Sequence, residues 1–407
     1  MTFFKLQSFG SIVRLGFGND TVVFFIGVLV LSSVITKSGL GKRISVFILS
    51  LTGNKTSNII LGFLLAGVVV GMWITNMAGA AMLMPIAKSM LEDEGLKPRE
   101  SNFGKALMIS CAYGALISGI TTPVACGPNI IAMNYMREIG VNISFLEWMM
   151  YGIPAAFLMI IPCWLILIIM FKPEISRLSK TKEELKAEFN AMGPMNRNEI
   201  ATAIIFVITI ALWISSTWLT GIIGIDLSGT IPALICTCLF FLPGVTSFKW
   251  KEISDDISWD GIILIATGMS LGIVMHQAGA AGWLSNVLLG RIAGMHTIAQ
   301  IFMIVMIVSL IKVGLSSNTV TAAIIMPIMI ALVQTYDMPL KGILLPTALS
   351  LSLAFILVAS SPTNLIPYST GYFSITDMAK AGAVMTVVTS AIIALSVFAI
   401  GSLAGIY

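Results

Sequence analysis

Residues Gly314 to Pro327 read GLSSNTVTAAIIMP, a stretch that combines membrane-like hydrophobicity with a cluster of polar side chains. Ser316 to Thr319, together with Thr321, interrupt what would otherwise be a continuous apolar span. A helix that begins inside a membrane leaves four backbone N–H groups without partners, and Ser, Thr and Asn are the residues that cap such an end. The stretch therefore predicts a helix start within the membrane.

The composition of the whole chain supports a membrane location. Of its 407 residues 57% are hydrophobic and 10% are charged, and the mean hydropathy is +0.97. Apolar stretches of about 20 residues separated by short loops indicate membrane-crossing helices rather than a barrel. The net charge of +4 is small and scattered, which argues against a nucleic-acid partner. The five cysteines lack the paired spacing of a disulfide framework or a metal site.

A second stretch repeats the first. TNMAGAAMLMPIA, which starts at Thr75, aligns without a gap with SNTVTAAIIMPIM, which starts at Ser317. Asn129 in GPNIIAM and Asn364 in PTNLIPY form a further matching pair, each next to a proline that interrupts a span. The expected spans place an odd number of crossings between the two units, so the halves are inverted. Such repeats are typical of secondary transporters that bind substrate near the middle of the membrane.

The expected fold is an all-α polytopic membrane protein with two inverted repeats, each containing a re-entrant hairpin and a broken helix. Most of the 23 Lys and Arg residues fall on the side of the central linker, and the positive-inside rule makes that side the cytoplasm of a plasma (cell inner) membrane. The expected units are a first repeat at 1–171 (hairpin 56–91, broken helix 103–138), a cytoplasmic amphipathic linker at 172–199, and a second repeat at 200–407 (hairpin 297–336, broken helix 342–370).

Charge indicates the kind of cargo. Each helix N-terminus carries roughly half a positive charge, so four converging ends would match a small dianion. All 19 Asp and Glu residues fall in loops, in the linker or at segment ends, so no carboxylate lies in mid-membrane to hold a cationic substrate or to relay protons. These patterns favour an anion.

The sequence also bears on classes of protein other than transporters. An enzyme is disfavoured because His276 and His296 stand at span ends without a HExxH or paired-carboxylate context. A non-transporting membrane scaffold and a carrier of another inorganic anion, such as arsenite, remain as alternatives. Polar residues in spans also serve simply to hydrogen-bond neighbouring helices.

Four motifs carry a resemblance to a known family. SSNTVTAAIIMP, GITTPVACGPN, SSPTNLIPY and GYFSITDMAKAG resemble the divalent anion:sodium symporter family, within the wider ion-transporter superfamily, whose members carry dicarboxylates, citrate or sulfate. The resemblance runs from about residue 20 to the C-terminus. Family members have additional spans before the position of Thr21, so this chain resembles an N-terminally shortened member.

The resemblance implies a secondary active transporter of small dianions that works by an elevator mechanism as a homodimer in membrane lipid. A C4-dicarboxylate is the first expectation for the substrate, with citrate and sulfate as alternatives. Transport would be coupled to sodium or proceed by exchange, and no cofactor other than coupling sodium ions is implied.

The resemblance also implies which residues form the sites. Substrate binding falls on Thr75, Asn76, Cys126, Gly127, Pro128, Ser317, Asn318, Thr319, Ser361 and Pro362. Cation binding falls on Thr75, Asn76, Ala125, Ser317, Asn318 and Ser360. Lys312, which departs from the family pattern, joins this set only as a stand-in for a bound cation.

This chain departs from the family pattern near both hairpin tips. Met77 stands where the first tip has a Thr, which removes a hydroxyl from the substrate site. Lys312 places an ammonium inside a span, at a cost of about 3 kcal/mol or more. One interpretation is that Lys312 substitutes for a bound cation or pairs with the anion. The other is that its long stem reaches out to the membrane interface.

Overall fold

The fold consists of helices joined by short turns. The structure, a computed structural model, describes residues 8–179, 187, 189–224, 229–292 and 294–406. Within these ranges no strand occurs, and 6 helices are long and apolar enough to cross a membrane. The predicted fold class, an all-α polytopic membrane protein, is therefore confirmed.

The two halves of the chain contain the same series of elements. The first half has α1 (Phe9–Phe17), α2 (Asp20–Ser38), α3 (Leu40–Ser50), α4 (Thr56–Gly71), α5 (Asn76–Asp93), α6 (Asn102–Ser118), η1 (Pro123–Ala125), α7 (Gly127–Glu138) and α8 (Phe145–Met170). The second has α10 (Arg197–Ile223), α11 (Thr230–Phe240), α12 (Trp250–Ser254), α13 (Trp259–Gln277), α14 (Ala280–Leu289), η2 (Gly290–Ile292), α15 (Thr297–Ile311), η3 (Lys312–Gly314), α16 (Asn318–Thr335), α17 (Leu340–Ser350), η4 (Val358–Ser360), α18 (Pro362–Tyr368) and α19 (Ile375–Leu403). From α2 and from α13 onward the order is the same: two helices joined at a glycine, a hairpin, a broken helix and a long final helix. The inverted orientation of the halves stays a prediction.

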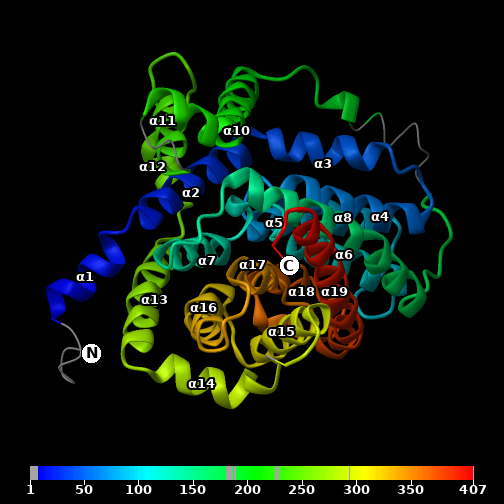
Figure 1. Cartoon of the computed structure of the whole chain (residues 1–407). Helices are drawn as coiled ribbons and strands as arrows, with labels where there is room; N and C mark the ends of the chain where they lie inside the picture. Colours follow the sequence, from blue (N-terminus) through cyan, green and yellow to red (C-terminus); the bar gives the residue numbers. More distant parts are fainter. Residues whose placement is uncertain (1–7, 180–186, 188, 225–228, 293, 407) are drawn as a thin grey trace.

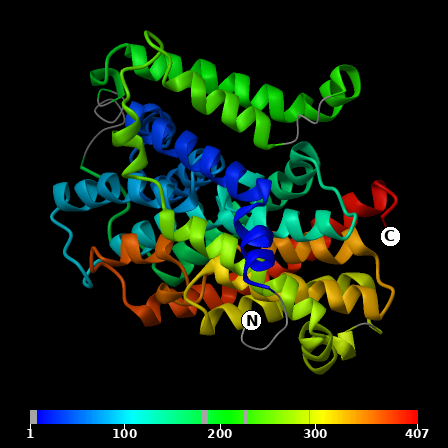
Figure 2. The same ribbon diagram turned by 90° about the vertical axis from the view of Figure 1, so that its left-hand side faces the viewer.

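The hairpins differ in how their arms pack. In the first, α4 and α5 lie against each other. In the second, α15 packs mainly on α17 and α19, whereas α16 packs mainly on α7, α13 and α14. Figure 1 shows α15 to α18 at the centre of the molecule, with α13 and α14 along the lower left and α10 to α12 above. In Figure 2 the green α10 lies along the upper edge, and it contacts α2.

An asparagine closes each helix break in the same way. The Asn129 Nδ2 donates to the carbonyls of Gly119 (2.6 Å) and Thr122 (2.9 Å). Its counterpart Asn364 donates to the carbonyls ten and seven residues before it, at 2.7 and 3.1 Å. Because backbone carbonyls that leave a helix inside a membrane need a donor, these two side chains allow the unwound segments to exist there.

Helices α3 and α14 are not anticipated by the sequence analysis. They follow α2 and α13 after sharp turns at Gly39 (φ 87°) and Gly279 (φ 73°). A left-handed backbone of this kind is cheap only for glycine. The two turns lie at matching places in the halves and so support the repeat.

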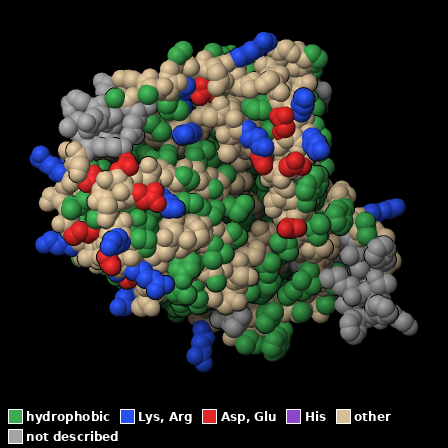
Figure 3. Space-filling view, turned by 180° about the vertical axis from the view of Figure 1, so that it is seen from behind, with side chains coloured by type: hydrophobic (Ala, Val, Ile, Leu, Met, Phe, Trp, Pro, Cys, Tyr) green, Lys and Arg blue, Asp and Glu red, His purple; other side chains and the backbone are tan. Residues whose placement is uncertain are grey.

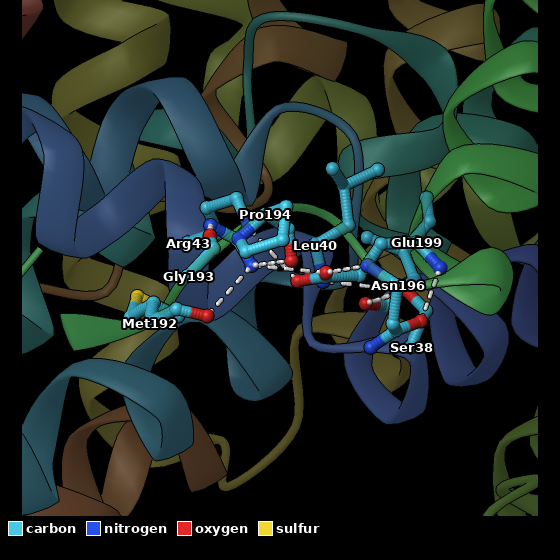
Figure 4. A network of polar contacts seen from close by, with 9 residues as sticks. Ser38, Leu40, Arg43, Met192, Gly193, Pro194, Asn196 and Glu199 are labelled. Atoms are coloured by element: carbon cyan, nitrogen blue, oxygen red, sulfur yellow. Dashed lines mark hydrogen bonds and ion pairs between the residues drawn. The ribbon is translucent and has the colours of Figure 1, made fainter. Parts of the chain in front are cut away.

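A cluster of polar contacts fixes the C-terminal end of the linker (Figure 4). Arg43 of α3 donates to both carboxylate oxygens of Glu199, at 2.9 and 3.0 Å, and to the carbonyl of Gly193 at 2.8 Å. Glu199 also accepts from the backbone N–H of Asn196, which completes a capping box at the start of α10. The amphipathic helix predicted for the linker falls largely on residues 180–186 and 188, which lie outside the described residues.

We expect replacement of Arg43 by Met to destabilise the protein, because it leaves the largely buried Glu199 carboxylate without its partner. Removing one partner of an ion pair in this way is destabilising because it leaves the other charge uncompensated. Thermal unfolding of the purified protein should start several degrees lower. Lys88→Met, which removes an exposed cation on α5, serves as the matched control. Equal unfolding midpoints for the two variants would contradict the role given to Arg43.

Candidate functional site

A cavity of about 1190 Å³ lies where the two hairpin tips meet the two helix breaks. The first residues of α5, α7, α16 and α18 all line it. Every residue predicted to bind substrate is among its lining residues: Thr75, Asn76, Cys126, Gly127, Pro128, Ser317, Asn318, Thr319, Ser361 and Pro362. Residues from four distant parts of the sequence therefore share one space.

Hydroxyl groups cap most of the helix ends at this cavity. Thr75 accepts from the N–H of Ala78, and Ser317 accepts from that of Val320, both at 3.4 Å. Ser361 caps the short α18 in the same manner. Helix N-termini present N–H donors and a partial positive charge, so the deep end of the cavity favours an anion.

Cys126 lies between the equivalent asparagines of the two repeats. The Nδ2 of Asn76 donates to the Cys126 Sγ at 3.5 Å, and the Asn318 side chain approaches the same sulfur. Each asparagine is 7% exposed. The two hairpin tips therefore meet at the N-terminus of α7, which has no side-chain cap of its own.

Three of the residues predicted to bind cations, Ala125, Ser360 and Lys312, do not line the cavity. Ala125 and Ser360 lie in the short 3-10 turns of the breaks and are buried at 0% and 3% exposure. Among the described residues, the buried polar atoms without a hydrogen-bond partner include four oxygens in these tips and breaks: Asn129 Oδ1, Asn318 Oδ1, Ser360 Oγ and Asn364 Oδ1. Neutral oxygens of this kind, next to the ends of interrupted helices, suit a monovalent cation such as sodium.

Lys312 is 1% exposed and points inward. Its Nζ donates to the carbonyl of Leu351, at the end of α17, with a distance of 2.7 Å. The interpretation in which the side chain reaches the membrane interface is therefore wrong. The carbonyl at the C-terminus of α17 accepts the hydrogen bond that water or lipid headgroups would accept from the ammonium at the membrane interface.

The opposite wall of the cavity comes from α2 and α13, and the sequence analysis does not identify it. Ser32 of α2 accepts from the backbone N–H of Thr75 at 3.1 Å, and Ser33 donates to Asp256 at 3.0 Å. Phe25, Leu29 and Leu264 supply apolar surface there. The only signal was the pair of serines within an otherwise apolar span.

The cavity reaches the protein surface on one side. Its lining follows α5 from Asn76 to Asp93, a rise of about 25 Å at 1.5 Å per residue. Lys42 and Asp256 also line the cavity, and Figure 3 shows a hollow bordered by charged side chains on the back face of Figure 1. By the predicted orientation this is the cytoplasmic side.

On the other side, polar contacts join α2 to α7 and border a second cavity of about 590 Å³. Arg137 of α7 pairs with Asp20 of α2 at 2.8 Å, and Thr21 donates to Asn134 at 2.9 Å. Both contacts lie at the start of α2, whereas the first cavity opens beyond its other end. A polar site between interrupted helices that opens to one face is the arrangement expected of alternating access.

The fold and the cavity define a polytopic membrane transporter. The chain belongs to the family described as sodium:sulfate symporter transmembrane region, which matches residues 4–405. The predicted family resemblance is therefore confirmed, and so are the predictions of a multi-pass integral membrane protein that is not an enzyme.

Relatives and one solved structure agree with this assignment. The sodium-dependent dicarboxylate transporter SdcS of Staphylococcus saprophyticus is 28% identical over 94% of this chain and 76% of its own length. SdcS of Staphylococcus aureus strain USA300 is also 28% identical, with the same coverage. The crystal structure of the Alcanivorax borkumensis YdaH transporter, described as having an unusual topology, covers 95% of this chain and 87% of its own, with a TM-score of 0.58 at 15% identity. At that identity the likeness concerns the fold alone.

We expect a cysteine at position 81 to react with a membrane-impermeant maleimide from the cytoplasmic side only. Ala81 lines the cavity on α5, whereas its neighbour Ala80 is fully buried and provides a matched control. The measurement is labelling of Ala81→Cys and Ala80→Cys in right-side-out and inside-out vesicles, with the exposed Cys238 replaced by Ser. Labelling of Ala81→Cys from the outside alone would contradict the predicted orientation.

Proposed function

We propose that this chain is a secondary active transporter of small organic dianions, with a C4-dicarboxylate as substrate and sodium as coupling ion. The observation that carries the proposal is the convergence of the α5, α7, α16 and α18 N-termini, with Asn76 and Asn318, on one cavity. The names of the relatives, sodium-dependent dicarboxylate transporters, point to the same chemistry.

The two hairpin tips would each hold one carboxylate of the substrate. The second tip offers the hydroxyls of Ser317 and Thr319 with the amide of Asn318. The first offers Thr75 and Asn76, but its third position is Met77, which cannot donate a hydrogen bond. The second tip is therefore the stronger anion site, and a dicarboxylate with two different ends would bind in one preferred direction.

Sodium would bind beneath the substrate, at the buried oxygens of the two breaks. Cations there would offset the charge of a dianion, so that substrate and ion bind together more tightly than either alone. Of the residues predicted to bind cations, Ser360 carries one of these oxygens and Ala125 lies in the first break, whereas Thr75, Asn76, Ser317 and Asn318 form the two hairpin tips. Sodium movement would be coupled to substrate movement because the affinity for the substrate depends on bound sodium.

Transport would proceed by movement of the two hairpins and the two broken helices against α2 and α13, in an elevator mechanism. The cavity lies between these groups of helices. An outward-open state would require the contacts of Arg137 with Asp20 and of Asn134 with Thr21 to separate. A homodimer in the lipid bilayer would hold the remaining helices still.

Sulfate is the second candidate substrate, favoured by the description of the family. It is a smaller dianion that a single tip would hold. Citrate, exchange without sodium, arsenite transport and a non-transporting scaffold are further outcomes that one experiment separates from the first proposal.

We expect succinate, malate or fumarate to raise the unfolding temperature of the purified protein, and more so when sodium replaces choline, because a ligand that binds only the folded state stabilises it. Uptake into proteoliposomes should show the same preference over sulfate and citrate. Stabilisation by sulfate alone would assign an inorganic substrate, and uptake unaffected by choline would indicate exchange. No response to any anion would reject transport in favour of a scaffold.

We expect Asn76→Ala and Asn318→Ala to reduce dicarboxylate uptake at least about tenfold, because a hydrogen bond to a charged group contributes about 1.5 kcal/mol or more. The unfolding temperature without ligand should change little. Asn102→Ala, which alters an exposed asparagine at the start of α6, provides the control. Full uptake by either tip variant would remove its asparagine from the site.

A further inference from the structure

Lys312 is a buried cation without an anionic partner. Its ammonium is 1% exposed and donates to the Leu351 carbonyl, and no described carboxylate forms an ion pair with it. The turn that carries it, η3, contacts the turn η4 of the second helix break. Lys312 does not line the cavity, whereas Asn318, six residues further along the chain, does. Its charge therefore lies beneath the cavity, between the second hairpin tip and the second break.

The neutral oxygens around the second break make this a suitable place for a cation. Ser360 Oγ, Asn318 Oδ1 and Asn364 Oδ1 are all buried without a donor, and they belong to the tip and the break that flank Lys312. The end of α17 adds the negative end of a helix dipole. An ammonium held at this end supplies the same unit charge that a bound monovalent ion would supply.

The first repeat has the same hairpin and helix break but has no lysine at the position that matches Lys312. Lys312 stands six residues before Asn318, and the residue six before the equivalent Asn76 is Val70, which is buried. Asn129 closes its break with the same hydrogen bonds as Asn364, and its Oδ1 is likewise buried without a donor. The break of the first repeat therefore contains a buried oxygen without a donor, that of Asn129, and the position that matches Lys312 supplies no charge.

We propose that the Lys312 ammonium is the cation of the second repeat when the dianion is bound, and that one exchangeable sodium ion binds in the first repeat at the Asn129 oxygen. The inference rests on the proposed function, because it concerns the charge balance of the same anion site. A dianion bound with one sodium ion and one fixed ammonium forms a neutral complex. Each transport cycle then carries one sodium ion and one dianion, so the cargo has a net charge of −1.

The wild-type protein tests this directly. In a sodium titration of succinate-dependent thermal stabilisation, we expect a Hill coefficient of about one. In proteoliposomes at pH 7.5, an inside-positive potassium diffusion potential should accelerate succinate uptake, because negative charge enters. A Hill coefficient near two, or acceleration by an inside-negative potential, would overturn the inference while leaving the proposed function intact. Failure to bind any anion would instead overturn the proposed function itself.

Three variants sharpen the test. Lys312→Ser should admit a second sodium ion, raise the Hill coefficient toward two and abolish the effect of voltage. Lys312→Met should lose succinate stabilisation, because it supplies neither a charge nor a ligand. Val70→Lys should make succinate binding independent of sodium. Unchanged sodium and voltage dependence in Lys312→Ser would overturn the proposal, and the wild-type measurements decide if the variants fail to fold. Lys88→Ser on the exposed surface is the control for loss of a positive charge.

Discussion

The structure depends on satisfying backbone groups where helices stop inside the membrane. A helix that ends in water leaves its terminal N–H and C=O groups to the solvent, but inside a bilayer each unpaired group costs several kcal/mol. Here four helices begin beside one cavity, which is lined by the first residues of α5, α7, α16 and α18. The protein meets part of the demand with caps such as Thr75 and Ser317 and leaves the remaining donors facing a cavity.

The same demand explains why oxygens collect beneath that cavity. Asn129 and Asn364 use their N–H₂ groups to hold two carbonyls each, so their own oxygens are left without donors. The groups needed to build the breaks therefore create positions that attract cations, while the helix N-termini above them attract anions. Under the proposed function, one structural device would then serve both kinds of ion.

Much of the fold and of the candidate site could be predicted from the sequence, because the polar clusters are local signals. The tips at Asn76 and Asn318 and the breaks before Asn129 and Asn364 stand out against apolar surroundings, and their repetition reveals the architecture. The direction of the Lys312 side chain could not be predicted, because it depends on where α17 ends relative to η3, which is a tertiary contact. The wall that includes Ser32 was missed for the same reason.

The two repeats differ at two matched positions in particular, one at the hairpin tip and one beneath it. Both differences add a polar or charged group to the second repeat. At the tips Thr319 corresponds to Met77, and beneath them Lys312 corresponds to Val70, so the second repeat has both the additional hydroxyl and the fixed charge. Under the proposals made above, a substrate carboxylate would be held more strongly at the second tip, while the first repeat would keep the exchangeable ion. In a molecule built from two similar halves, such differences would separate the task of holding the anion from the task of responding to the ion gradient.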